Sequence, residues 1–493
     1  MKPRSRRAFL AHGAAFVATL PIAALPGALI AQMPIRVLRA ERRVIEIDGR
    51  AADVFALRDE KGNHGLIFDR NEPFRVQLEN RIGSPTLVHW HGLTPPWEQD
   101  GMPDLPFAPL SHGETRLYDF PLHEAGTYWM HSHLGLQKQA LLAAPLIVRD
   151  PDEAAIDRQE VVIMLHDFSF RPAEEILASL ESGGHMMAAD GSMASSSDPH
   201  AGHEMGNGVD PMAEMGETSP MMLHANDVNF DAYLANDRTL GDPEIVTVER
   251  AGRVRLRIVN AAAATNFFID TGALPTSLVA VDGRDVRPIA GTRFPVAMSQ
   301  RIDLDIATPA GGGAFPILAL REGDRARTGI VLATAGAAVA KLSGLADEVA
   351  ALLDLGLEHR IEAAAPLPER MVDRQLTVDL VGGDGDYRWG LDLRDGDEGS
   401  RIEIERGERV EMVFRNRTGM SHPMHLHGHG FQIVAIGNHR FAGARRDTVL
   451  VPPASSVAVA FDADNPGRWM LHCHHLYHMA AGMMTMLDYR GIG

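Results

Sequence analysis

A segment of seven residues in which apolar and polar side chains alternate occurs three times along the chain, and this repeat constrains the fold most. Each copy ends in asparagine, and the copies are residues 74–80, 254–260 and 410–416. Alternation with a period of two predicts a strand with one buried face. A histidine stands nine residues after the asparagine in the first and third copies (His89 and His425), whereas Ile269 stands there in the second. The repeat predicts an all-β fold of three related Greek-key β-sandwich domains, of which the middle one has lost its metal.

A second repeat links residues 126–133 with residues 467–474. In both segments a histidine follows the first glycine by five residues and another follows two residues later, but Ser132 stands where Cys473 stands. The first domain therefore lacks a thiolate and keeps only paired histidines. We expect these histidines to face their counterparts from the third domain across an interface, where the two domains share one metal cluster.

Cys473 is the only cysteine of the chain and stands between His472 and His474, with His478 and Met483 shortly after. A thiolate, an imidazole and a thioether on one short segment match a blue-copper electron-transfer site, which has two histidines, one cysteine and a weak axial methionine. If the segment is a strand, His472 and His474 point away from Cys473 and must serve a different metal. The cysteine of one site is then covalently next to two ligands of another, which indicates a path for electrons.

Seven further histidines occur in three clusters, namely His422, His425 and His427, then His89 and His91, and His131 and His133. With the cysteine segment, these clusters resemble the four copper-binding motifs of the multicopper oxidases, in the family's order and spacing, from about residue 40 to residue 493. The resemblance implies three cupredoxin-like domains. It also implies an enzyme that couples one-electron oxidation of a donor to the four-electron reduction of dioxygen to water.

The resemblance further implies four copper ions and a role for each motif residue. The type 1 copper would be held by His422, Cys473 and His478, with Met483 axial. The type 2 copper would be held by His89 and His425. The pair of type 3 coppers would be held by His91, His131, His133, His427, His472 and His474. Imidazole suits copper, and a thiolate with a thioether suits the Cu(I) state that a type 1 site must visit.

Asp100 is the candidate catalytic residue. It lies nine residues after His91, and in the family an acidic residue at this place hydrogen-bonds near the three-copper cluster and feeds protons to reduced oxygen. A carboxylate beside a cationic cluster can relay protons, and the alternative is an Asx-turn residue ahead of a glycine. Asp447 is a second candidate, which would hold an imidazole tautomer. Three histidines off the pattern are interpreted as neighbours of the ligands or as surface residues: His429, His439 and His475.

The first 31 residues predict a targeting segment rather than folded structure. Arg6 and Arg7 precede a modest apolar run that glycine and proline interrupt, which is typical of a signal for the twin-arginine export machinery. Export by this route predicts a periplasmic protein. In that oxidising compartment a single cysteine excludes an internal disulfide, so Cys473 is expected to serve a metal.

Length and charge bound the remaining organisation. The predicted domains are residues 33–150, 151–365 and 366–493, and the Ala- and Leu-rich stretch 340–370 predicts a connecting helix and a linker. The formal net charge of -18 argues against nucleic acid or an anionic membrane as a partner. Away from the first 31 residues, no stretch has the 18 or more apolar residues of a membrane span.

Residues 185–224 form a predicted insertion in the second domain that is rich in methionine and histidine. It has eight methionines, four histidines and six acidic residues, and it has no lysine or arginine. This composition predicts a mobile segment that does not fold by burial. Thioethers are soft ligands that prefer Cu(I), and short histidine-rich tracts also favour metal binding. The alternative is a neutral low-complexity loop.

The insertion and the export signal together resemble the periplasmic copper-tolerance branch of the family, whose members oxidise Cu(I) to Cu(II). Met420, two residues before His422, is expected to help deliver Cu(I). The chain departs from that branch because its insertion lies in the second domain and no carboxylate directly precedes His422. Oxidation of phenols, as in laccases, and oxidation of Mn(II) stay open. A copper-storage or chaperone protein and a non-enzymatic relative without copper are the alternatives from other classes.

Overall fold

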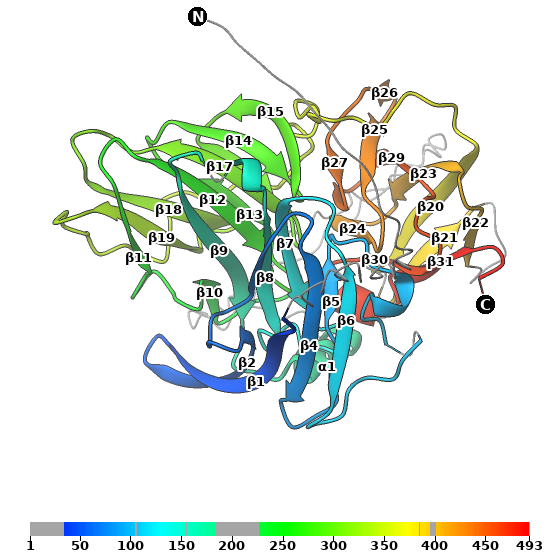
Figure 1. The fold of residues 1–493 in the computed structure, drawn as a ribbon, viewed down its shortest axis with the longest axis horizontal. Coiled ribbons are helices and arrows are strands. Elements are labelled where there is room, and N and C mark those ends of the chain that lie inside the picture. Colours follow the sequence, from blue (N-terminus) through cyan, green and yellow to red (C-terminus); the bar gives the residue numbers. More distant parts are fainter. Residues whose placement is uncertain are drawn as a thin grey trace, which may run out of the picture. The chain divides into compact units, whose positions relative to one another are not determined.

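Strands make up most of the chain's regular structure. The computed structural model describes residues 34–103, 106–153, 155–183, 226–383, 385–394 and 401–492. Their strands form six sheets, consistent with three cupredoxin-like β-sandwich domains, so the predicted fold class is confirmed at this level (Figure 1). The predicted targeting segment 1–31 and the predicted insertion 185–224 lie outside the described residues. No helix within those residues is long and apolar enough to cross a membrane.

The first two sheets each have four strands, in the orders β2-β1-β4-β6 and β3-β8-β7-β5. Their strands are β1 (Arg36–Ile47), β2 (Arg50–Asp59), β3 (Leu66–Asp69), β4 (Pro73–Arg81), β5 (His89–His91), β6 (Thr115–Pro121), β7 (Gly126–His131) and β8 (Ala143–Arg149). Short 3₁₀ helices follow at η1 (Trp97–Gln99) and η2 (Pro151–Glu153). Phe74, Trp90 and Tyr118 pack in the core of this pair.

The second two sheets have the orders β10-β9-β12-β17-β14-β15 and β11-β19-β18-β13-β16. Their elements are β9 (Gln159–Phe168), α1 (Ala173–Glu181), β10 (Ala232–Ala235), β11 (Ile245–Val248), β12 (Arg253–Asn260), β13 (Phe267–Asp270), β14 (Thr276–Val281), β15 (Arg284–Ala290), β16 (Arg293–Val296), β17 (Arg301–Ala307), β18 (Ala314–Arg321) and β19 (Arg327–Thr334). Aliphatic side chains dominate their shared core.

The last two sheets have the orders β21-β20-β23-β29-β25-β26, with β27 paired to β25, and β22-β31-β30-β24-β28. Their elements are β20 (Arg374–Gly382), β21 (Trp389–Leu393), β22 (Ile402–Ile404), β23 (Arg409–Asn416), β24 (His422–Leu426), β25 (Phe431–Ile436), β26 (His439–Arg440), β27 (Arg445–Arg446), β28 (Thr448–Val451), β29 (Ser456–Asp462), β30 (Arg468–Cys473), α2 (Leu476–Ala480) and β31 (Met484–Tyr489). Cys473 and Met483 belong to the core of this pair. The exact limits given for the three domains stay a prediction.

The three repeat segments lie on β4, β12 and β23, and each strand has the same place in its sheet. Each pairs in parallel with the first strand of its own pair of sheets (β1, β9 or β20) and antiparallel with β6, β17 or β29. Burial alternates along β4 as predicted, but β12 is buried on both faces. The reason is that β12 also packs against the first pair of sheets, where Val259 shares a small core with Trp129.

The asparagine that ends each repeat fixes the loop that follows. The side-chain amide of Asn80 donates to the carbonyl oxygens of Ser84 and Leu110, and its side-chain oxygen accepts the N–H of Ile82. Asn260 and Asn416 make the same three kinds of hydrogen bond with their own loops. An asparagine that closes such a turn on its own backbone sets the path of the chain.

After this shared turn, the chain enters a strand that carries a histidine in two of the three cases. His89 on β5 pairs with His131 on β7, and His425 on β24 pairs with His472 on β30. At the matching place in the second pair of sheets, Ile269 on β13 pairs with Ala319 on β18. This apolar pair offers no metal ligand at the matching place, as expected for a middle domain that has lost its metal.

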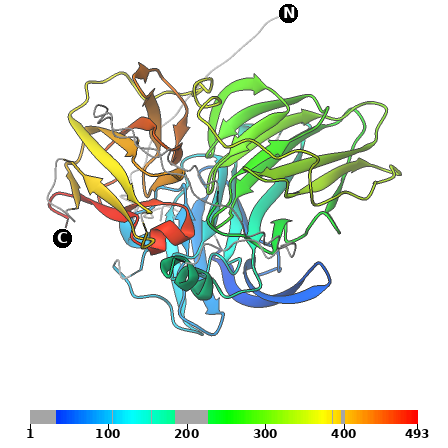
Figure 2. The same cartoon turned by 180° about the vertical axis from the view of Figure 1, so that it is seen from behind.

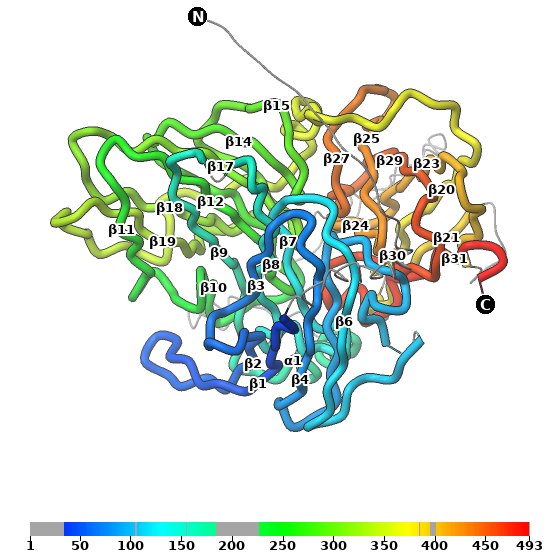
Figure 3. Tube along the Cα trace, in the orientation of Figure 1, coloured from blue at the N-terminus to red at the C-terminus, as the bar shows by residue number. Residues whose placement is uncertain are grey.

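The prediction of a connecting helix within residues 340–370 is wrong. This segment is an irregular strap with a tight turn at 356–360, and Figure 3 shows it as a yellow-green tube. Besides the hydrogen bonds of that turn, its backbone bonds with distant residues: the Arg327 N–H donates to the Gly344 carbonyl, and the Ala364 N–H donates to the Asp285 carbonyl. Leu353 and Ile361 are buried against other elements. Tertiary partners have therefore overridden the helical propensity of the alanines and leucines.

Helices α1 and α2, the two α-helices of the described residues, lie against each other although about 300 residues separate them in sequence. Ile176 and Leu180 of α1 share an apolar cluster with Leu476 and Tyr477 of α2. Figure 2 shows the teal α1 beside the red α2. Because α2 follows directly after Cys473, this contact joins the middle pair of sheets to the segment that carries the predicted type 1 ligands.

Candidate metal centre

A first cluster brings together three of the predicted ligands. His422 begins β24, Cys473 ends β30 and His478 lies on α2, and all three are fully buried. The Cys473 Sγ lies 3.7 Å from His422 Nδ1 and 3.9 Å from His478 Nδ1, and the two Nδ1 atoms lie 3.2 Å apart. Three donor atoms thus converge on one point with the donor set of a blue-copper site.

Hydrogen bonds select the nitrogen that each of these imidazoles presents. Thr418 Oγ1 lies 2.7 Å from His422 Nε2, and an Asp227 carboxylate oxygen lies 3.3 Å from His478 Nε2. Both rings therefore keep Nδ1 for the cluster. Met483 is buried beside them, and its carbonyl oxygen accepts the Cys473 N–H at 3.0 Å.

Burial governs the protonation of this cluster when no cation is bound. It raises the pKa of the Cys473 thiol and lowers the pKa of His422 and His478, the last to about 3. A thiol in such a place loses its proton only when its sulfur binds a metal ion. The donor set and its burial thus fit a bound copper ion.

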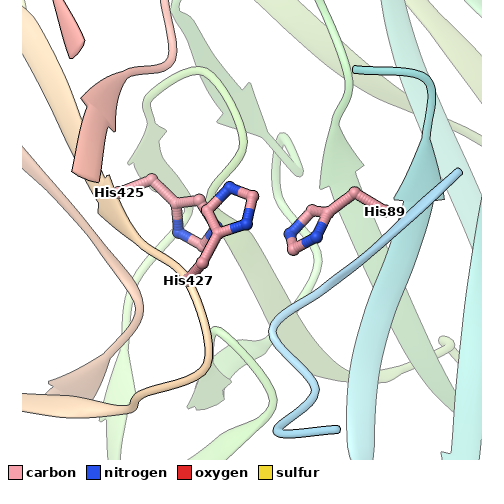
Figure 4. Close-up of side chains that lie close together, drawn as sticks. All are labelled: His89, His425 and His427. Atoms are coloured by element: carbon pink, nitrogen blue, oxygen red, sulfur yellow. The ribbon is translucent and has the colours of Figure 1, made fainter. Parts of the chain in front are cut away.

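A second cluster contains the other eight predicted histidines, all of them buried. They come from β5, β7, β24 and β30 or the residues directly after, so both the first and the third pair of sheets contribute: His89, His91, His131, His133, His425, His427, His472 and His474. The rings of His91 and His425 stack with centroids 3.8 Å apart, as do those of His89 and His427. Figure 4 shows His89 facing His425 and His427 across this interface. The shared cluster predicted from the repeats is present.

Six of these histidines hold a buried ring nitrogen that has no hydrogen-bond partner. The atoms are His89 Nε2, His91 Nδ1, His131 Nε2, His133 Nε2, His425 Nε2 and His474 Nε2. In the remaining two, His427 Nε2 and His472 Nε2 face each other at 3.1 Å. Unpaired buried nitrogens are costly in a folded protein, and convergent imidazoles are ligands that copper accepts. The eight residues therefore fit a group of copper ions.

Two aspartates hold the other ring nitrogen of four of these histidines. An Asp100 carboxylate oxygen lies 2.7 Å from His427 Nδ1, and the Asp100 carbonyl accepts from His89 Nδ1 at 3.0 Å. An Asp447 carboxylate oxygen lies 3.0 Å from His91 Nε2, and the Asp447 carbonyl accepts from His425 Nδ1 at 2.8 Å. Both aspartates are buried, and each fixes two ring orientations, one through its carboxylate and one through its backbone carbonyl.

Burial also lowers the pKa of seven of the eight histidines, the pKa of His425 to about 4, so that they are held neutral and able to bind metal. Lys138 is buried beside them with its Nζ 3.1 Å from His474 Nδ1. Burial lowers the pKa of Lys138 to about 7. A copper ion bound at the unpaired Nε2 of His474 would leave the proton of this ring on Nδ1, facing the lysine amine.

Sequence reasoning missed Lys138 and Asp227, which touch the ligands from distant parts of the chain. Asp227 contacts both His478 and His475, the latter at 3.1 Å, and Tyr387 donates its hydroxyl to the same carboxylate. Burial opposes ionisation of Asp227, but His475 and the hydrogen bonds from both histidines hold its pKa well below the ordinary value. Neither residue belongs to a local motif, so a single sequence carries no signal for them.

The remaining candidates differ in their surroundings. His429 is buried, with Nδ1 3.0 Å from the His427 carbonyl and Nε2 2.6 Å from the Tyr489 hydroxyl, whereas His439 is exposed. His475 is the N-cap residue of α2. Met420 is buried in the core of the last pair of sheets, and its part in the delivery of Cu(I) stays a prediction.

Comparison with known proteins agrees with these clusters. Three family models described as multicopper oxidase match residues 41–153, 160–340 and 373–490. Multicopper oxidase MmcO of Mycobacterium tuberculosis is 31% identical over 84% of this chain and 79% of its own length. Copper resistance protein A of Escherichia coli is 25% identical over 85% of this chain and 86% of its own. The structure of Fet3p, a multicopper oxidase that functions in iron import, superposes with a TM-score of 0.72 at 19% identity, covering 92% of this chain and 90% of Fet3p.

The chain therefore belongs to the multicopper oxidase family, and it is a copper-dependent oxidase that uses dioxygen as acceptor. Its buried histidine clusters fit the type 1, type 2 and type 3 copper sites of such an enzyme.

Proposed function

We propose that this multicopper oxidase takes its electrons from Cu(I), which it converts to Cu(II), and that it serves copper tolerance. The balanced reaction joins four Cu(I), four protons and one dioxygen to give four Cu(II) and two waters. The observation that carries the proposal is the Asp227 carboxylate, which contacts His478 on the side away from Cys473. An anionic group at this place attracts a small cation and gives no advantage to a neutral donor.

The surroundings of His478 also favour a small donor. The ring is fully buried, Trp389 stacks on it with centroids 4.0 Å apart, and Asp227 and Tyr387 cover the Nε2 edge. An aromatic donor would have to displace these side chains before it reached the imidazole. The similarity to copper resistance protein A supports the proposed role in copper tolerance.

The individual ligand roles belong to this proposal. Bound copper would supply one-electron transfer at His422, Cys473 and His478 and dioxygen reduction at the eight-histidine cluster. Its ligands there would divide as the motifs imply, with His89 and His425 at type 2 and the other six at type 3. The ligand atoms of His133, His427 and His472 already lie within 4.8 Å of one another.

The protein provides a short route between the two clusters. Cys473 lies in the first, and its chain neighbours His472 and His474 lie in the second. His472 Nδ1 also donates to the Cys473 carbonyl at 2.9 Å, which adds a hydrogen-bonded route to the covalent one. Reduction of dioxygen to water also consumes protons. The buried Asp100 carboxylate lies against His89 and His427, where it can pass protons toward the dioxygen that is reduced at the eight-histidine cluster.

Two further parts of the proposal concern residues outside the described ranges. The twin-arginine signal at 1–31 would bring the protein to the periplasm. The methionine- and histidine-rich segment 185–224 ends just before Asp227, so it would collect Cu(I) close to the carboxylate that contacts His478. Replacing 185–224 by a short Gly/Ser linker should lower the rate only at low Cu(I), and unchanged Cu(I) kinetics would return the segment to a neutral loop.

The test of the substrate is a comparison of steady-state kinetics on anaerobically prepared Cu(I), a neutral phenol and Mn(II). Asp227→Asn keeps the shape of the side chain and removes its charge. It should lower kcat/KM for Cu(I) by about tenfold more than kcat/KM for the phenol, because any effect through His478 is common to both donors and only the cation is attracted. Asp231→Asn is the matched control, since Asp231 lies four residues away and bonds to Ser169 instead. Equal losses on Cu(I) and phenol, or a parent enzyme that prefers phenol, would contradict the proposal.

A further inference from the structure

The middle pair of sheets contributes no copper ligand under the ligand roles proposed above. One of its side chains nevertheless contacts a residue that holds two histidines of the eight-histidine cluster. Arg301 is the first residue of β17 and is fully buried. Its guanidinium makes a bidentate pair with Asp447 of the third pair of sheets, at 2.7 and 2.6 Å. Asp447 in turn contacts His91 and His425.

Arg301 is itself held in one orientation. Its Nε donates to the Thr127 carbonyl at 3.1 Å, and Asp282 accepts its backbone N–H at 2.9 Å. The residues before it also hold β28, which begins directly after Asp447: Ser299 bonds to the Thr448 hydroxyl at 3.0 Å, and Gln300 donates to the Thr448 carbonyl at 3.1 Å. The guanidinium is thus fixed from the first and second pairs of sheets while it binds the third.

This arrangement determines which ring nitrogen His91 presents to the cluster. Its Nε2 is taken by Asp447, so Nδ1 is the nitrogen left for the cluster, whereas five other histidines there leave Nε2 unpaired. A carboxylate that could rotate would release His91 from this unusual orientation. A planar guanidinium that binds both carboxylate oxygens prevents that rotation.

We propose that Arg301 is a positioning residue for the copper cluster. It fixes the Asp447 carboxylate and, through this carboxylate, the imidazole of His91. By holding Asp447 it also fixes the backbone carbonyl that accepts from His425. This role is independent of the electron donor. Through Arg301, the middle domain, which has no copper ligand of its own, helps to position ligands at the oxygen-reducing site.

The experiment compares copper-loaded variants by copper content and by the electron paramagnetic resonance signal of the type 2 copper. Arg301→Met removes the fork but keeps a long side chain. We expect it to weaken retention of type 2 and type 3 copper against a chelator by about 10–100-fold and to shift the type 2 signal. The blue absorption of the type 1 site should stay, because Arg301 does not contact that cluster.

Arg257→Met is the matched control. Arg257 is a buried arginine of the same domain that pairs with Asp303 and Glu160 and touches neither Asp447 nor a histidine of the cluster. It should cost stability and leave the type 2 signal unchanged. A double variant, Arg301→Met with Asp447→Asn, should perturb the signal no more than Asp447→Asn alone, because both changes break one link.

Two results would overturn the proposal. One is an Arg301→Met protein whose copper retention and type 2 signal match those of Arg257→Met, which would make Arg301 only a structural ion pair. The other is full additivity in the double variant. If Arg301→Met does not fold, Arg301→Lys decides, since lysine keeps the charge and loses the fork: a shifted type 2 signal supports the role, and an unshifted one overturns it.

Discussion

At the scale of single residues, the donor atoms are selected by hydrogen bonds on the far side of each ring. Asp100 and Asp447 each fix two histidines, and Thr418 and Asp227 fix those beside Cys473. A side chain so held does not need to reorient when a metal ion arrives. Preorganisation of this kind lowers the cost of binding and narrows the choice of metal.

The glycine after His91 has a specific reason to lack a side chain. Gly92 has a φ of +89°, and a Cβ there would lie 2.5 Å from an Arg301 nitrogen, 2.8 Å from an Asp447 oxygen and 2.9 Å from the Tyr128 ring. Gly92→Ala should therefore destabilise the protein and also disturb the type 2 copper signal. Thermal unfolding and paramagnetic resonance measure the two effects.

Gly83→Ala separates strain from contact, because Gly83 has the same φ of +89° and nothing within 4 Å of the added Cβ. It should cost only the backbone strain, about 1–2 kcal/mol, and leave the copper signal unchanged. If Gly92→Ala behaved like Gly83→Ala in both measurements, the close packing of Arg301 and Asp447 against Gly92 would have no functional weight.

At the scale of elements, the same strand and turn are used three times with different outcomes. Each repeat strand ends in an asparagine that fixes the next loop, and the following strand presents His89, Ile269 or His425 at one register. The turn is thus a structural device, and the residue after it decides whether a metal is held.

Asn416→Ala and Asn260→Ala test this separation. Asn260→Ala removes three buried hydrogen bonds and Asn416→Ala removes four, so each should lower the free energy of unfolding by about 1–3 kcal/mol. Only Asn416→Ala should also change the copper spectra, because its loop leads to His422 and His425. Equal spectra for the two variants would show that the turn does not position the metal ligands.

At the scale of the whole molecule, the three domains divide the work. The first and third supply the imidazoles, while the middle one supplies Arg301 on one side and Asp227 on the other, both through contacts with residues of the third. The strap 340–370 and the contact between α1 and α2 hold the domains together. The eight-histidine cluster takes its ligands from two domains, whereas the ligands beside Cys473 all lie in the third domain and receive only the contacting Asp227 from the second.

What the sequence predicted and what it missed follow from the range of the interactions. The ligand clusters were predictable because histidines in motifs and strand periodicity are local signals. Asp227, Lys138 and Arg301 lie far along the chain from the residues they contact, and each is an ordinary charged residue in its own neighbourhood. The helix expected within 340–370 is absent because the backbone partners of that strap are distant strands, which propensity cannot register.

The buried histidines make the copper-free protein sensitive to acid. Burial lowers the pKa of His425 to about 4 and of His478 to about 3, against about 6.5 in an unfolded chain. The unfolded state therefore takes up protons first, and stability should fall as the pH drops below about 6.5 and continue to fall toward the folded pKa values. Thermal unfolding of the copper-free protein between pH 8 and pH 4 measures this, and a flat profile would contradict it.

The dioxygen consumed per Cu(I) oxidised measures most directly whether the proposed oxidation of Cu(I) is coupled to the four-electron reduction of dioxygen. We expect one dioxygen for every four Cu(I), with no hydrogen peroxide released. Cys473→Ser is the control, since it should lose this activity with the blue colour while keeping the copper of the histidine cluster. One dioxygen for every two Cu(I) with release of peroxide, or activity that survives in Cys473→Ser, would contradict the account.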